Sequence, residues 1–281
     1  YHVLEGPAGY GKTKLLSVLH TRFKDEKKYL SVLVAAHPQP GLLRMIQDIH
    51  ASLGLSQNPV LSTTLPDESQ AQEELLSRMG REHANEICDL YFGSNNGAQR
   101  KPISGVVLLV DNLDALPENE IHLFLGHYLP AMEQHLSLIE PFSLGGCFRV
   151  IVSLRYLTST NNYIMRYLPA KVSLKPFAFY YVKQTVTSVL SRPPRLHVEA
   201  HIEQFTADIM HTTAGHPECI IKVLDLYREK KGLPPVFMRE HSTQIWDGIV
   251  QPKITDIRSG IPEHLHPIFS TLSIFREFNV A

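Results

Sequence analysis

The chain has 281 residues, of which 43% are hydrophobic and 20% are charged, so it can bury a sizeable core and is not intrinsically disordered. Its 27 Lys and Arg residues are balanced by 28 Asp and Glu residues, which gives a formal net charge of -1. That balance argues against a protein built mainly to coat nucleic acid or an anionic membrane. No uncharged apolar run approaches the roughly 18 residues that a membrane span needs, so we expect no membrane partner.

The cysteines and the two ends of the sequence indicate its setting. Cys88, Cys147 and Cys219 are far apart and show no C-x-x-C spacing. This pattern is typical of reduced thiols, so we expect a cytoplasmic protein without zinc or disulfides. The sequence begins in a strand pattern without an initiator Met and stops after an apolar helix pattern without a cap. We therefore expect a piece of a longer chain that carries further sensor or effector domains.

The first predicted elements are a strand at residues 3–4, a glycine-rich turn, and a helix at residues 12–23. The turn fits G-x-x-x-x-G-K-[ST], the phosphate-binding loop, at every defined position. Its backbone N–H groups can point at phosphate oxygens, Lys12 supplies charge to the β- and γ-phosphates, and the Thr13 hydroxyl ligates Mg²⁺. The predicted nucleotide-binding residues of this segment are Gly6, Pro7, Ala8, Gly9, Tyr10, Gly11, Lys12, Thr13 and Lys14.

Strand and helix patterns continue to alternate through the first half of the chain. Helices are predicted at residues 42–53 and 66–79, and strands at residues 29–36, 106–110, 150–152 and 171–174. The strand at 106–110 is apolar on consecutive residues, which is typical of a strand covered on both faces. We therefore predict the α/β fold of a P-loop NTPase, a parallel sheet with helices on both faces.

Two acidic residues follow the strand at 106–110. Asp111 comes directly after the apolar run, at the edge where parallel sheets bind ligands, so we predict that it holds Mg²⁺ together with Thr13. Asp114 can reach the same edge one turn later and is the candidate for orienting the attacking water. A structural alternative stays open for Asp114, because an Asp shortly before Pro117 often begins a turn or a helix.

The strand at 150–152 is followed by Ser153 and Arg155, which should emerge at the same edge as Asp111. An arginine at this place can detect whether a γ-phosphate is present. Arg155 therefore completes a predicted catalytic set with Lys12, Asp111 and Asp114. Taken alone, an Arg at the end of a strand is more often a solvated surface charge.

Strand patterns end after residue 176. Helices are predicted at residues 180–190, 202–213 and 217–230, which indicates an all-helical part behind the α/β core. Gly215 and Pro217 suit the turn into the last of these helices, because proline fits the first turn of a helix.

The order of these motifs resembles the STAND family of signal-transduction P-loop ATPases, a branch near AAA+ that includes NACHT and NB-ARC proteins. The segments that carry the resemblance are residues 6–13, 109–114, 152–155, 174–177, 213–217 and 272–278. At residues 152–155, Leu154 replaces a small polar residue of the family pattern, so only Arg155 carries over.

The resemblance implies three domains: an NTPase core at residues 1–176, a helical lid at residues 177–232, and a linker with the start of a winged helix at residues 233–281. It also implies that His216 and Pro217 lie beside the adenine. ATP and ADP with Mg²⁺ are the implied cofactors. ATP in place of ADP would favour self-association through the NTPase module, and hydrolysis would be slow.

Two other functions stay open. One is an AAA+-like DNA-binding ATPase of the origin-recognition or helicase-loader type, which also has a lid and a winged helix. Residues 179–281 carry 11 Lys or Arg and 11 Asp or Glu residues, and this even charge counts against a nucleic-acid partner. The other is a degenerate nucleotide-binding scaffold, which the intact Lys12, Thr13 and Asp111 disfavour. Asn112 nevertheless stands where AAA+ machines carry a catalytic Glu, and this predicts slow turnover.

Overall fold

The computed structural model describes residues 1–26, 28–39, 41–55, 65–91, 103–138, 147–155, 164–190, 201–230 and 234–259. The segment at 272–278 that resembles the opening of a winged helix lies outside these ranges. The described chain divides into two compact units, one made of Tyr1–Glu5 and Lys12–Ser173, the other of Gly6–Gly11 and the chain from Leu174 onward. The predicted domain boundaries at residues 176 and 232 stay predictions.

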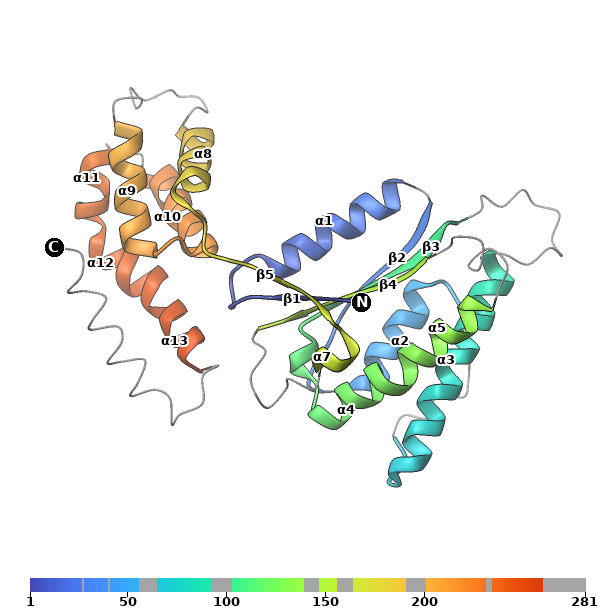
Figure 1. Ribbon diagram of the computed structural model, residues 1–281. Helices are drawn as coiled ribbons and strands as arrows, with labels where there is room; N and C mark the ends of the chain where they lie inside the picture. Colours follow the sequence, from blue (N-terminus) through green and yellow to red (C-terminus); the bar gives the residue numbers. More distant parts are fainter. Residues whose placement is uncertain are drawn as a thin grey trace. The chain divides into compact units, whose positions relative to one another are not determined.

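A parallel sheet forms the centre of the first unit (Figure 1). Its strands are β1 (His2–Glu5), β2 (Tyr29–Ala35), β3 (Gly105–Asp111), β4 (Cys147–Leu154) and β5 (Ala170–Ser173). They lie in the order β2-β3-β4-β1-β5, and every neighbouring pair is parallel. Each residue of β3 is buried, because the strand is covered on both faces.

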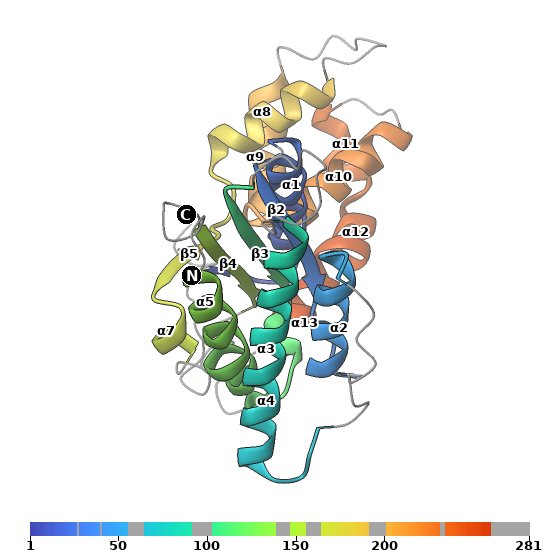
Figure 2. The same ribbon diagram turned by 90° about the vertical axis from the view of Figure 1, so that its right-hand side faces the viewer.

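Helices cover both faces of this sheet. They are α1 (Lys12–Asp25), α2 (Leu42–Ser52), α3 (Ser69–Tyr91), α4 (Glu118–Leu123), α5 (Leu129–Ser137) and α7 (Ile164–Tyr167). α1 lies on one face, and α2, α3 and α5 lie on the other (Figures 1 and 2). The predicted α/β fold is confirmed.

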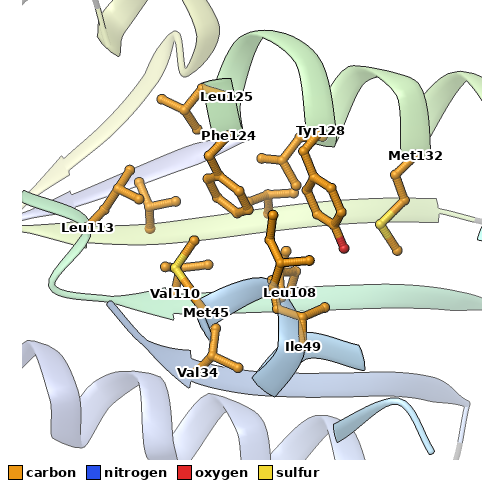
Figure 3. Packing of buried hydrophobic residues seen from close by; sticks show 14 of the residues in the cluster. Val34, Met45, Ile49, Leu108, Val110, Leu113, Phe124, Leu125, Tyr128 and Met132 are labelled. Carbon is orange, nitrogen blue, oxygen red and sulfur yellow. The ribbon is translucent and has the colours of Figure 1, made fainter. Parts of the chain in front are cut away.

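The main core fills the space between the sheet and the helices α2, α3 and α5. Figure 3 shows Leu108 and Val110 of β3 facing side chains from α2 and from the π-helical turn η2 (Phe124–Tyr128). The rings of Phe124 and Tyr128 stack at a centroid distance of 5.6 Å. Each such side chain contributes roughly 1.5–3 kcal/mol when it leaves water, so this cluster fixes the sheet from which the polar strand ends project.

Two parts of this unit differ from the sequence prediction. α3 continues to Tyr91, although its acidic pattern predicts an end near Met79. Gly80 lies inside the helix, where an added Cβ would be 2.4 Å from the backbone oxygen of Tyr128. The glycine therefore permits a close approach between α3 and η2. The segment from α4 to α5 was not predicted, because α4 has only six residues and a π-helical turn shifts the apolar periodicity before α5.

The second unit is helical in all its described elements outside the phosphate loop. They are α8 (Phe179–Leu190), α9 (Ile202–Thr213), α10 (Pro217–Lys230), α11 (Pro234–Glu240), α12 (Ser242–Ile245), the π-helical turn η4 (Trp246–Val250) and α13 (Gln251–Ser259). Their core contains the contacting rings of Phe205, Tyr227 and Phe237. Within the ranges that the structure describes, no helix is both long enough and apolar enough to cross a bilayer.

Candidate nucleotide-binding site

The phosphate loop connects β1 to α1 through two glycines with positive φ. Gly9 has φ +80° and Gly11 has φ +84°, in a region that only glycine adopts without strain. Between them, the N–H of Tyr10 donates to the carbonyl of Pro7 over 3.3 Å and tightens the turn. The backbone path itself therefore requires Gly11, the second defined glycine of the motif, and also Gly9, which the motif leaves open.

The next residues form the first turn of α1. The Lys12 residue is 6% exposed, whereas Thr13 and Lys14 are exposed. Burial lowers the pKa of Lys12, and the carboxylates of Asp114 and Asp111 offset part of this effect. The lysine charge therefore lies within electrostatic reach of both predicted acidic site residues.

Asp111 ends β3 as a buried carboxylate with several donors. Its Oδ2 accepts a hydrogen bond from the Thr13 hydroxyl over 2.5 Å. Its Oδ1 accepts hydrogen bonds from the Ser153 hydroxyl and from the N–H of Asn112, the latter over 3.1 Å. Because Val110 of β3 pairs with Val152 of β4, the two following residues reach the same edge of the sheet. The parallel register thus brings Asp111 and Ser153 together.

Asp114 lies on the 3₁₀ turn η1 (Leu113–Ala115), which follows directly after β3. Asn112 makes the bend with φ 54°, a left-handed conformation that asparagine tolerates better than most residues. Asp114 Oδ2 accepts the backbone N–H of Arg155 over 3.1 Å, whereas its Oδ1 is buried and has no hydrogen-bond partner among the described residues. The Arg155 side chain is exposed. The charge of Arg155 also lowers the pKa of Lys12, although this effect is smaller than that of burial and smaller than the opposite effects of the two carboxylates. Arg155 therefore lies within electrostatic reach of the Lys12 amine.

Ser153 is the site residue that the sequence prediction placed at the right edge without giving it a role. It is fully buried, and its hydroxyl also accepts the N–H of Asn112 over 3.0 Å. A polar residue at the penultimate position of an apolar strand is the signal that could have identified it, because such a residue needs a partner inside the protein.

The second unit holds His216 next to the segment Gly6–Gly11, which belongs to the same unit. His216 Nε2 lies 3.0 Å from the carbonyl oxygen of Ala8, and its ring meets that of Tyr10 edge-on at 5.0 Å. Burial lowers the pKa of His216, although the Ala8 hydrogen bond and other contacts partly oppose this. The histidine is therefore neutral and contacts the loop backbone.

Pro217 is the buried first residue of α10. The turn that leads into it uses two left-handed residues, Ala214 with φ 49° and Gly215 with φ 75°. The carbonyl of Gly215 accepts the N–H of Phe177 over 2.8 Å, which attaches this turn to the start of the helical part. The glycine and proline of the motif thus shape a sharp entry into α10, and contact of Pro217 with adenine stays a prediction.

Comparison with known proteins identifies the fold. No protein-family model matches the sequence, and no curated protein matches it. Among solved structures, Cdc6p from Pyrobaculum aerophilum is 18% identical, with 87% of this chain and 61% of that chain covered and a TM-score of 0.52. This chain therefore shares the fold of that structure, and at 18% identity the similarity shows the fold alone.

Two further AAA+ structures match at TM-scores below 0.5. The ORC2 protein of Aeropyrum pernix, in ADPNP–ADP complexes, is 12% identical, with 82% of this chain and 56% of that chain covered and a TM-score of 0.47. A RuvB variant of Thermotoga maritima is 14% identical, with 86% and 61% covered and a TM-score of 0.42. The chain thus spans about three fifths of the length of these structures.

The sequence predicts a nucleotide with Mg²⁺, and the residues present fit such an ion. The Thr13 hydroxyl and the Asp111 carboxylate are adjacent hard oxygen donors, the ligand type that Mg²⁺ prefers. The described part of the chain contains no group of three or more His, Cys, Asp or Glu side chains that could hold a metal alone. Mg²⁺ itself usually takes one or two protein oxygens and completes its shell with phosphate and water.

Proposed function

We propose that the chain binds an adenine nucleotide with Mg²⁺ and hydrolyses ATP slowly. The observation that carries this proposal is the hydrogen bond of 2.5 Å between Thr13 and Asp111, beside the buried Lys12. It joins the hydroxyl that follows the phosphate loop to the carboxylate at the end of β3. A lysine, a hydroxyl and a carboxylate arranged in this way provide charge for phosphate oxygens and oxygen ligands for a divalent cation.

The roles of the remaining residues follow from their chemistry. Asp114 has a carboxylate oxygen without a hydrogen-bond partner among the described residues, so it can accept a hydrogen bond from the attacking water. Arg155 carries a charge that can distinguish ATP from ADP. Asn112 offers a carboxamide, which cannot accept a proton as a carboxylate does, and this supports slow turnover.

Two finer functions are compatible with such an ATPase, and the fold favours the origin-recognition or helicase-loader type. The support is the Cdc6p similarity, which extends over 87% of the chain at a TM-score of 0.52. In this function the ATP state would bind DNA. The even charge of residues 179–281 does not decide against it, because a local patch is enough for phosphate contacts.

The second candidate is a STAND-type switch that self-associates when ATP replaces ADP. The observation in its favour is the turn Gly215-His216-Pro217 at the start of α10. This turn resembles the G-x-P motif of that family. Here ADP would hold the helical part closed. A nucleotide can shift such states only by its different affinity for each of them.

Calorimetry with Lys12→Ala tests the proposed nucleotide binding. Loss of the charge-assisted contact is expected to weaken both ADP and a non-hydrolysable ATP analogue by roughly ten- to hundredfold. Lys24→Ala is the matched control, because Lys24 is an exposed residue in the last turn of the same helix. Unchanged nucleotide affinity in Lys12→Ala would refute the assignment of the loop.

A further inference from the structure

The structure places a histidine of the helical unit on the backbone of the phosphate loop. His216 is 6% exposed, and its Nε2 lies 3.0 Å from the carbonyl oxygen of Ala8. Its other ring nitrogen, Nδ1, lies 3.4 Å from the backbone nitrogen of Cys219, whose N–H donates to it. A neutral ring that accepts at Nδ1 carries its proton at Nε2, so His216 donates a hydrogen bond to Ala8.

This hydrogen bond determines the direction of a neighbouring N–H group. In a planar trans peptide the C=O and the following N–H point in opposite directions. Because the Ala8 carbonyl points at His216, the N–H of Gly9 points away from that ring. Backbone N–H groups of such a loop are the groups that bind phosphate, so His216 controls the aim of one of them.

The packing around Gly9 leaves this peptide little freedom. A Cβ on Gly9 would lie 2.4 Å from Oε2 of Glu218 and 2.5 Å from Cε1 of His216. Glu218 is itself held by Lys222 over 2.8 Å and by Lys253 over 3.0 Å, which ties α10 to α13. The orientation of the loop peptide and the packing of these two helices therefore depend on each other.

We propose that His216 is a positioning residue that aims the Gly9 N–H at the phosphates of a nucleotide and thereby couples occupancy of the loop to the packing of α10. The inference rests on the proposed nucleotide binding, and it gives His216 a role toward the loop in place of one toward the adenine. Coupling of this kind is reciprocal: a bound nucleotide stabilises the first turn of α10 to the same extent that α10 supports nucleotide binding.

Three variants test the proposal by calorimetry with ADP and a non-hydrolysable ATP analogue. His216→Ala removes the donor and is expected to weaken both nucleotides alike, by about three- to tenfold. His216→Gln keeps an N–H donor and is expected to recover most of the affinity. His211→Ala is the control, because His211 is an exposed histidine at the end of α9 and should bind like the unmutated protein. Parent-like affinity in His216→Ala, or equal losses in the Ala and Gln variants, would overturn the proposal.

Hydrogen exchange gives a second readout that does not depend on the stability of the Ala variant. In the unmutated protein ADP should slow exchange in the first turn of α10 as well as in the loop, and His216→Gln should retain this effect. Protection confined to residues outside α10 would overturn the coupling. If the unmutated protein bound no nucleotide at all, the proposed function would fail first, and this inference with it.

Discussion

Asp111 is a buried carboxylate that depends on its hydrogen-bond donors. With only 4% of the residue exposed, its charge is stabilised by the hydroxyls of Thr13 and Ser153 and by the N–H of Asn112. In the proposed function the Asp111 carboxylate would also face Mg²⁺, and the Ser153 hydroxyl would help to hold it in place. The importance of Ser153 should therefore be largest in the presence of Mg²⁺.

The role of the Ser153 hydroxyl can be tested by removing it, with EDTA buffer as the control for Mg²⁺. Ser153→Ala is expected to weaken ADP binding roughly five- to tenfold in Mg²⁺, because a hydrogen bond to a charged group is lost. In EDTA, where Asp111 has no ion to hold, the affinity should change little. Calorimetry under both conditions checks this. Equal losses in the two buffers would point to a general packing defect.

His83 is a second buried polar residue, and it lies far in sequence from the predicted site. It is 2% exposed, its Nδ1 lies 2.9 Å from the hydroxyl of Tyr128, and its ring lies 4.6 Å from that of His50. Burial, followed by the charge of His50, lowers the pKa of His83 to about 3. The folded protein therefore keeps this ring neutral where an unfolded chain would protonate it.

This difference makes stability depend on pH in a defined direction. The full contribution of the neutral ring is present above the unfolded pKa near 6.5 and is lost as the pH falls from there toward 3. Between pH 7 and pH 5 the free energy of unfolding should fall by on the order of 2 kcal/mol on this account. Urea unfolding of the parent and of His83→Gln at both pH values tests it. The His83→Gln variant should be less stable than the parent at pH 7, but its free energy of unfolding should fall less between pH 7 and pH 5. The same pH dependence in both proteins would contradict the lowered pKa of His83.

At the scale of elements, the close contact between α3 and η2 depends on Gly80, which has no side chain. A Cβ on Gly80 would lie 2.4 Å from the Tyr128 oxygen and 3.1 Å from the Met132 nitrogen, which are backbone atoms that cannot rotate away. Gly80 therefore sets how near the two helices lie, and with them the Phe124 and Tyr128 side chains over the sheet.

Gly80→Ala should lower the stability of the protein although alanine is the better helix former. Overpacking is expected to exceed the gain in helix propensity and to destabilise by about 1–3 kcal/mol. Gly248→Ala is the matched control, because its Cβ would meet nothing within 4 Å and should leave stability unchanged or slightly higher. Urea unfolding measures both. A stabilised Gly80→Ala variant would show that α3 can move away at no cost.

The elements that the sequence predicted well are those whose signals are local. The apolar run of β3 and the proline at the start of α10 each specify their own structure. The bounds of α9 and α10 agree with the approximate predicted ranges. The joint position of Thr13 and Asp111 was predictable too, because parallel strands end at one edge. What could not be predicted depends on distant partners: Gly80 is read as a helix end unless its contact with Tyr128 is known, and Ser153 has a role only beside Asp111.

At the scale of the whole molecule, the two finer functions predict different responses to nucleotide and salt. The origin-recognition type is expected to bind duplex DNA when ATP is bound, with log affinity falling linearly with log salt concentration. Fluorescence anisotropy with a labelled duplex, in ADP and in the ATP analogue, measures this.

Light scattering in the same two nucleotides measures self-association and so tests the STAND-type switch. Self-association in the ATP analogue without measurable affinity for DNA would replace the origin-recognition proposal by the STAND-type switch. The Lys12→Ala variant controls both measurements, because either response should disappear when nucleotide no longer binds.

Because Gly6–Gly11 belong to the helical unit, neither unit is one continuous segment of the chain. The chain passes between the two units after Glu5, after Gly11 and after Ser173, so no single cut separates them. A gene segment for residues 1–173 would encode the loop without His216, and one for the remainder would encode His216 without the loop. Recombination that swapped the helical part for another would therefore have to supply a new side chain for the Ala8 carbonyl.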